Sequence, residues 1–210
     1  MSHFTRIVLP ALLLSFVSLP AMADSVTYLA MINTSSQNGN YGYLDLELNA
    51  GSLPGSGAVV ATVSDFTGAA LNPSDPANDE LGTATGSLPG ALTLNNSGFN
   101  DYFEGMTFGS GITFDVTLSG SGVSLLGGAP FTSGTTFASV FCDATCSNNL
   151  FVSDTASGAA VLLNVEPDGS VSGSGPATLV PEPGSLSLIL CGSVVMLLAS
   201  RRRRPVGDTL

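Results

Sequence analysis

The stretch Ile112-Thr113-Phe114-Asp115-Val116-Thr117-Leu118 decides the fold class of this chain. Its apolar side chains alternate with polar ones, which is the pattern of a β-strand that buries one face and wets the other. The same alternation occurs at residues 26–32 and at residues 41–48. Helical periodicity does not recur between the two ends of the chain. We therefore expect an all-β domain with antiparallel strands.

Five shorter apolar runs extend this pattern, at residues 58–63, 91–94, 135–141, 150–152 and 159–165. Turn-forming residues separate the runs, as at Leu53-Pro54-Gly55 and Asp168-Gly169. About eight or nine short strands at such spacing predict an antiparallel β-sandwich, of which a jelly roll is one version. The Gly and Pro content is also typical of disorder, but the regular alternation and the eleven phenylalanines argue against it.

Residues 1–23 have the layout of a secretory signal peptide. One charge, Arg6, precedes an apolar run, and the small residues Ala21 and Ala23 flank Met22 just before Asp24. The alternative is a retained membrane anchor, but the run is short for the ~30 Å of hydrocarbon in a bilayer. We expect the secretion machinery to export the chain and cleavage to follow Ala23.

The other end carries three elements in a fixed order. Pro181-Glu182-Pro183 is followed by a stretch without charge at residues 185–200 and then by Arg201, Arg202, Arg203 and Arg204. As a helix the uncharged stretch would be about 24 Å long, and the arginines would hold its far end in the cytoplasm. Residues 181–204 are thus predicted to be a membrane-inserted tail and residues 205–210 a short cytoplasmic extension. An ordinary single-span anchor is the alternative.

This tail resembles the PEP-CTERM sorting tails of exported bacterial proteins. The resemblance implies a Gram-negative host, often one that makes extracellular polysaccharide or biofilm. It also implies an exosortase partner that cuts near Pro181, Glu182 and Pro183, which would be recognised as substrate. The protein would be anchored in the inner membrane with its domain in the periplasm, and then released to the cell surface. The extension at residues 205–210 departs from such tails, which usually end soon after the arginines.

The segment between the two ends contains no Lys, Arg or His. The basic residues of the chain are Arg6 and Arg201 to Arg204, and its histidine is His3, whereas fourteen of its sixteen acids lie at residues 24–180. Histidine-dependent and lysine-dependent catalysis are therefore excluded from this segment. Nucleic-acid binding is also excluded, because a polyanion needs basic partners. We expect a domain at residues 24–170 that is not an enzyme and has no catalytic residues.

Two groups of residues are candidates for local chemistry. Cys142 and Cys146 enter an oxidising compartment, where a disulfide across the intervening turn is expected. A redox-active pair would need a nearby cation to lower a thiol pKa, and the segment has none. The loop at residues 72–80 offers Asp75, Asp79 and Glu80 as calcium ligands, since calcium prefers carboxylate oxygen. It lacks the EF-hand spacing, and a solvated acidic turn is the alternative.

Export and sorting favour a structural protein of the cell surface or extracellular matrix, associated with exopolysaccharide. A surface module that binds calcium or carbohydrate is the first alternative. A glycoside hydrolase that uses only carboxylates is the second, although the chain has no Trp on which sugars could stack. Residues 171–180, rich in Ser, Gly and Pro, are expected to form a flexible stalk.

Overall fold

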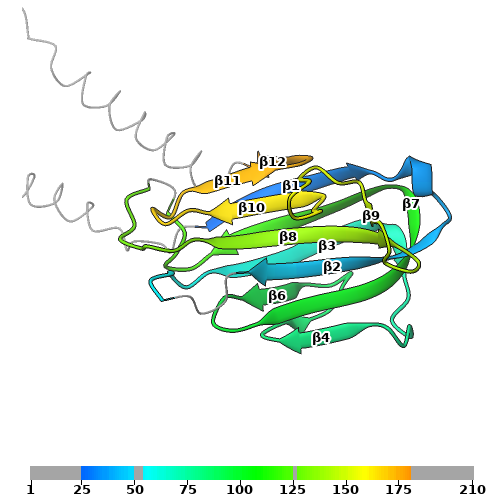
Figure 1. Cartoon of the computed structure of the whole chain (residues 1–210), viewed down its shortest axis with the longest axis horizontal. Helices are drawn as coiled ribbons and strands as arrows, with labels where there is room; N and C mark the ends of the chain where they lie inside the picture. The colour runs from blue at the N-terminus through cyan, green and yellow to red at the C-terminus, as the bar shows by residue number, and fades with distance from the viewer. Residues whose placement is uncertain (1–24, 50–53, 125–126, 181–210) are drawn as a thin grey trace, which may run out of the picture.

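The computed structural model describes residues 25–49, 54–124 and 127–180, which form one antiparallel sheet of twelve strands (Figure 1). The strands are β1 (Ser25–Asn33), β2 (Tyr41–Asn49), β3 (Val60–Leu71), β4 (Asp79–Gly82), β5 (Thr85–Gly86), β6 (Leu92–Asn95), β7 (Asn100–Ser119), β8 (Thr135–Asp143), β9 (Asn149–Leu150), β10 (Val161–Val165), β11 (Val171–Ser174) and β12 (Ala177–Val180). The prediction of an antiparallel all-β fold is confirmed.

Both predicted targeting segments lie outside the described residues. This holds for the signal peptide with Ala21 and Ala23, for the motif Pro181-Glu182-Pro183, for the arginines at 201–204 and for residues 205–210. Within the described residues, helical structure amounts to the short 3-10 turn η1 (Ser35–Gln37), which could not cross a membrane.

The alternating stretches of the sequence form strands with the expected inward faces. Ile112, Phe114, Val116 and Leu118 are each no more than 1% exposed, and they lie in the second half of β7. The leucines of β2 are buried in the same way. The short strand predicted at residues 150–152 is wrong in extent, because β9 ends at Leu150 and Phe151 adopts a φ of 56°.

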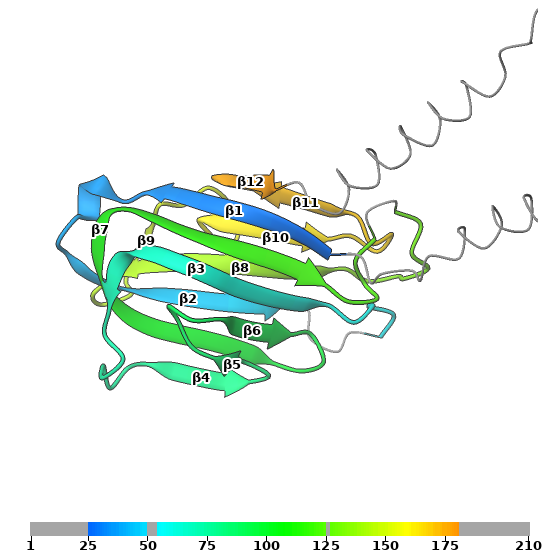
Figure 2. The same ribbon diagram turned by 180° about the vertical axis from the view of Figure 1, so that it is seen from behind.

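The 20-residue strand β7 belongs to both halves of the sheet. Its first half pairs with β2 and β4, whereas residues 111–119 pair with β1. The sheet consequently doubles back along β7. Strands β10, β8 and β2 lie toward the viewer in Figure 1, and β1, β3 and β6 lie toward the viewer in Figure 2. Apolar side chains from both halves fill one core between them, among them Leu44, Phe114 and Phe137.

Glycines allow β3 and β7 to approach each other where they bend. The β3–β7 register shifts twice between Ser64 and Ala69, and Gly68 has a φ of 93°. A Cβ atom on Gly68 would overlap the carbonyl oxygen of Gly111, and one on Gly109 would overlap the carbonyl oxygen of Gly68. The bend therefore requires glycine for its backbone conformation at Gly68 and for space at both positions.

Two buried asparagines complete the backbone hydrogen bonding where the ladders end. The Asn100 side chain accepts from the amide of Leu48 at 2.6 Å and donates to its carbonyl at 2.8 Å. Asn96 accepts from the amide of Val59 at 2.8 Å and donates to Gly57 and to Thr135. Each side chain takes the place of a neighbouring strand for groups that would otherwise be buried without partners.

The stalk predicted at residues 171–180 is instead part of the sheet. Strand β11 pairs with β10, and β12 pairs with β1. Gly175, with a φ of 95°, and Pro176 separate the two strands. The Ser and Gly content reflects their position, because β11 and β12 pair on one side only and their side chains are mostly exposed. Few apolar residues are needed at such an edge.

Replacement of Gly68 by Ala tests the bend. We expect Gly68→Ala to lower the free energy of unfolding by more than about 2 kcal/mol, because it combines a disfavoured backbone conformation with overlap at Gly111. Gly39→Ala is the matched control: Gly39 also has a positive φ, but no atom of the described residues lies within 4 Å of an added Cβ. Urea unfolding should show a loss of only about 1 kcal/mol for the control. Equal losses for the two variants would contradict the requirement for space.

Candidate functional site

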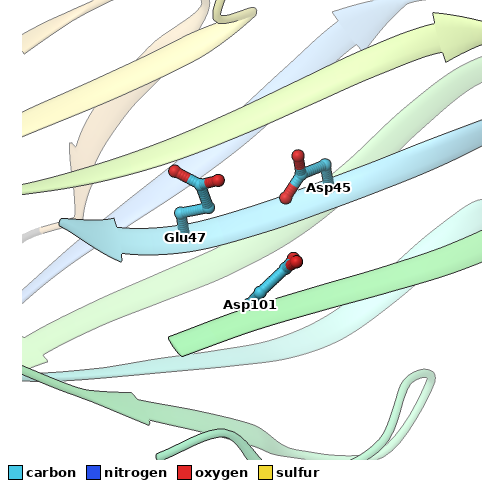
Figure 3. Close-up of side chains that lie close together, drawn as sticks. All are labelled: Asp45, Glu47 and Asp101. Carbon is cyan, nitrogen blue, oxygen red and sulfur yellow. The ribbon is translucent and has the colours of Figure 1, made fainter. Parts of the chain in front are cut away.

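Three carboxylates meet on the outer face of the sheet, where β2 lies beside the first half of β7. Asp45 and Glu47 project from β2, and Asp101 reaches toward them from β7 (Figure 3). One oxygen from each lies within 4.8 Å of the others. We call this group the acidic triad. Among the described residues it is the one group of three or more possible metal ligands gathered in this way.

Strand register and alternation bring the triad together. Asp45 lies opposite Phe103 and Leu46 opposite Tyr102, so the same register places Glu47 at the level of Asp101. The leucines of β2 occupy the core, and the two acids between them must therefore face outward. On the other side of β2, Val140 and Ala138 of β8 lie opposite Asp45 and Glu47. The triad is thus bordered by apolar side chains.

Burial and mutual repulsion shift the titration of the triad. Burial raises the pKa of Asp45 to about 8, and the charges of Glu47 and Asp101 add to the rise. Burial also raises the pKa of Asp101, while a hydrogen bond from Asp45 opposes that rise. Asp45 is therefore the member that keeps its proton near neutral pH, and it shares that proton with Asp101.

The triad has free oxygen atoms with which to bind a ligand. Atom Oδ1 of Asp45 and atom Oδ1 of Asp101 are buried without a hydrogen-bond partner within the described structure. Converging carboxylate oxygens are the ligands that a hard cation such as calcium prefers, with water completing its coordination. A bound cation would also remove the repulsion that raises the pKa of Asp45.

Aromatic rings continue the same outer face beyond the triad. Tyr43 and Phe103 stack with ring centroids 4.8 Å apart, and Tyr41 meets Tyr43 edge-on at 5.6 Å. The Tyr41 hydroxyl donates to the carboxylate of Asp75. Rings beside carboxylates offer the two contacts by which proteins hold sugars, namely apolar stacking and hydrogen bonds to hydroxyl groups.

The residues predicted as calcium ligands do not form a comparable group. Asp75 accepts hydrogen bonds from Tyr41 and from the amide of Ala77, and both bonds lower its pKa, the first of them more. Asp79 and Glu80 are consecutive residues of β4, opposite Phe103 and Tyr102, so their side chains leave opposite faces of the strand. The structure places its three converging carboxylates at Asp45, Glu47 and Asp101 instead.

Cys142 and Cys146 are joined by a disulfide with their Cα atoms 4.8 Å apart. It encloses the start of the turn between β8 and β9, at the place expected from the sequence. Asp143 organises the same turn by accepting from Asn148, Thr145 and Ser147, and these bonds lower its pKa to about 2. Disulfide and carboxylate therefore stabilise one connection between strands.

Sequence reasoning found the outward position of Asp45 and Glu47 but missed their partner. Asp101 lies more than fifty residues further along the chain, in the first half of β7, where apolar and polar residues do not alternate regularly. The polar-apolar order Asp101-Tyr102-Phe103-Glu104 hides the strand because Phe103 faces outward and Glu104 inward.

No known family model, curated protein or solved structure matches this chain.

Replacement of Asp45 by Asn tests the electrostatics of the triad. Because the pKa of Asp45 is raised on folding, the contribution of Asp45 to stability is fully present below its unfolded pKa of about 4 and is lost as pH rises toward about 8. Asp45→Asn carries no such charge, so its melting temperature relative to wild type should increase between about pH 5 and about pH 9 in the presence of a chelator.

Asp168→Asn is the control for this measurement. Hydrogen bonds from Ser170 lower the pKa of Asp168, so its contribution to stability is lost as pH falls. Asp168 is ionised in both the folded and the unfolded state between about pH 5 and about pH 9, so the melting temperature of this variant relative to wild type should stay constant over that range. A constant difference in melting temperature between Asp45→Asn and wild type over the same range would show that folding does not raise the pKa of Asp45.

Proposed function

We propose that this chain is an exported protein of the bacterial cell surface or extracellular matrix, sorted through its C-terminal tail by an exosortase. The observation that carries the proposal is the ordered tail of Pro181-Glu182-Pro183, an uncharged stretch and four arginines. After export the domain would stand in the periplasm while the tail is held in the inner membrane. Release near the motif would then deliver it to the surface, in association with exopolysaccharide.

The boundaries of the sheet are compatible with processing at both ends. Strand β1 begins two residues after Ala23, and β12 ends at the residue before Pro181. These two strands pair with each other from Thr27–Val180 to Ala30–Ala177. Cleavage at the predicted sites would therefore leave all twelve strands in place. We interpret the doubled sheet as a β-sandwich of the jelly-roll type.

The composition of the domain supports a role other than catalysis. Residues 24–180 contain no Lys, Arg or His, so general bases of the imidazole type and amine nucleophiles are missing. The carboxylates and hydroxyl groups that remain are suited to hydration and to contact with polysaccharide. This composition supports the proposed structural or matrix-associated role.

Intact-mass analysis of the protein recovered from its host tests sorting. We expect the wild-type product to begin at Asp24 and to end near Pro181-Glu182-Pro183. A variant with Ala at all three motif positions should keep its tail, because the extended, proline-restricted substrate is lost. A wild-type product that still ends at Leu210 would reduce the tail to a membrane anchor and exclude the exosortase.

A surface module that binds calcium or carbohydrate is the second candidate function. It is favoured by the acidic triad with its two unpartnered oxygens and by the neighbouring rings of Tyr43 and Phe103. Calcium at the triad could bridge the domain to hydroxyl groups of a polysaccharide. A hydrolase that uses two carboxylates is a weaker candidate, which a glycan panel without turnover would exclude.

Thermal melting with calcium tests the second candidate. Millimolar calcium should raise the melting temperature of the wild-type chain, because a ligand that binds only the folded state stabilises it. The double variant Asp45→Asn/Asp101→Asn should lose this rise. Asp115→Asn, which removes a half-buried carboxylate from the second half of β7, should retain it. An unchanged wild-type melting temperature would exclude calcium binding at the triad.

A further inference from the structure

Two adjoining hollows lie where the chain passes from β3 to β4. One has a volume of about 330 Å³, and the described residues that line it are all apolar, among them Phe66, Leu71 and Leu88. The other, of about 230 Å³, is lined partly by Asp79, Glu80 and Glu104. Pro73 borders both, and Ser87 and Leu88 border one each. The shared Pro73 and the consecutive residues Ser87 and Leu88 place the two hollows next to each other, and we call the pair the groove, with an apolar end and an acidic end; its lining includes no member of the acidic triad.

Hydrogen bonds fix the walls of this groove. Asn72 donates its amide to the carbonyl of Gly105 at 2.8 Å, and the amide of Gly105 donates to the side chain of Asn78 at 2.7 Å. On the other side, the amide of Leu88 donates to the Tyr102 hydroxyl at 3.1 Å. The groove is therefore formed before any ligand arrives, which limits the entropy lost on binding.

Glu104 is the buried carboxylate of the acidic end. Its side chain is only 7% exposed, and the Tyr102 hydroxyl donates to its Oε2 atom at 3.1 Å. Burial raises the pKa of Glu104. The described residues contain no Lys, Arg or His, so no positive charge within them can neutralise this carboxylate. A cation for Glu104 has to come from outside the domain.

We propose that the groove binds an organic cation, namely a primary ammonium group carried on an apolar stem. The ammonium would meet Glu104, and the stem would occupy the hollow beside Leu71 and Leu88. An ammonium supplies three donors and a full charge to a dehydrated carboxylate, the setting in which a charge-assisted hydrogen bond is strong. Burial of the apolar stem in the hollow is favourable because it removes apolar surface from water.

The lining favours this ligand over a metal ion or a neutral molecule. The carboxylates of the groove do not converge as those of the triad do, and the apolar hollow offers no oxygen ligand to a metal. A neutral apolar molecule would leave Glu104 without a counter-charge. An anion would be repelled by Glu104 and by the negative charge of the domain.

Calorimetric titration of the full chain with hexylammonium tests the proposal. We expect saturable binding, with hexanol and hexanoate binding at least about tenfold more weakly, because they lack the charge that pairs with Glu104. Glu104→Gln, which keeps the shape of the side chain, should weaken hexylammonium binding by about tenfold or more. Glu166→Gln, at a carboxylate outside the groove, should bind as wild type does.

A second variant addresses the apolar end and guards against misfolding of the first. Ala69→Leu adds side-chain volume to the apolar hollow and should weaken hexylammonium binding while Glu104 stays intact.

Titration with Nα-acetyllysine amide then distinguishes two sources of the ammonium group, a lysine side chain of a protein and a free amine. Binding as tight as that of hexylammonium assigns it to a protein side chain, and weaker binding assigns it to a free amine.

Three outcomes would overturn the proposal. These are no binding of hexylammonium up to about 10 mM, equal binding of hexylammonium and hexanol, and unchanged binding when both Glu104→Gln and Ala69→Leu are folded. The proposal does not depend on sorting. If the groove does not bind hexylammonium, the proposed sorting by an exosortase is unaffected. If the tail is not processed, the proposed binding in the groove is unaffected.

Discussion

The shared bend of β3 and β7 is the constraint on which the rest of the structure depends. Because β7 passes from one half of the sheet to the other, it lies beside β2 and β4 first and beside β1 afterwards. Backbone contact at Gly68, Gly109 and Gly111 lets β3 follow it through the turn. That contact keeps β3 paired with β7 on both sides of the bend, so that the two halves of the sheet enclose one core.

A second constraint is electrostatic, since residues 24–180 carry acids and no bases. The domain deals with its carboxylates in two ways. In turns, Asp143, Asp154 and Asp168 accept hydrogen bonds from nearby amides and hydroxyls, which lower their pKa values. On β2 and β7, burial raises the pKa of Asp45 and of Glu104, because dehydration there exceeds what hydrogen bonds return. The second class marks the places where an external cation would be most favourable, and both proposed binding regions lie there.

The candidate site was predictable only in part. Alternation in β2 places Asp45 and Glu47 outside while Leu44 and Leu46 are buried, so their position follows from local sequence. Asp101 does not, because its meeting with Asp45 depends on the register between β2 and β7 over more than fifty intervening residues. Register is set by the whole hydrophobic pattern and by the bend, neither of which is visible in a short window of sequence. The calcium site predicted at Asp75, Asp79 and Glu80 was based on composition alone, and the structure does not bring these three side chains together.

The sequence by itself determined the all-β class, the inward faces of β1, β2 and the second half of β7, and the absence of bases at residues 24–180. These properties are local or compositional, because a period of two residues fixes which side chains share a face. Only the tertiary structure decided that β7 serves both halves of the sheet. It also decided that residues 171–180 pair as edge strands, that Asp101 completes the triad, and that Glu104 is buried beside an apolar hollow. Each of these depends on contacts between distant segments, whose energy comes from burial against partners that the local sequence does not specify.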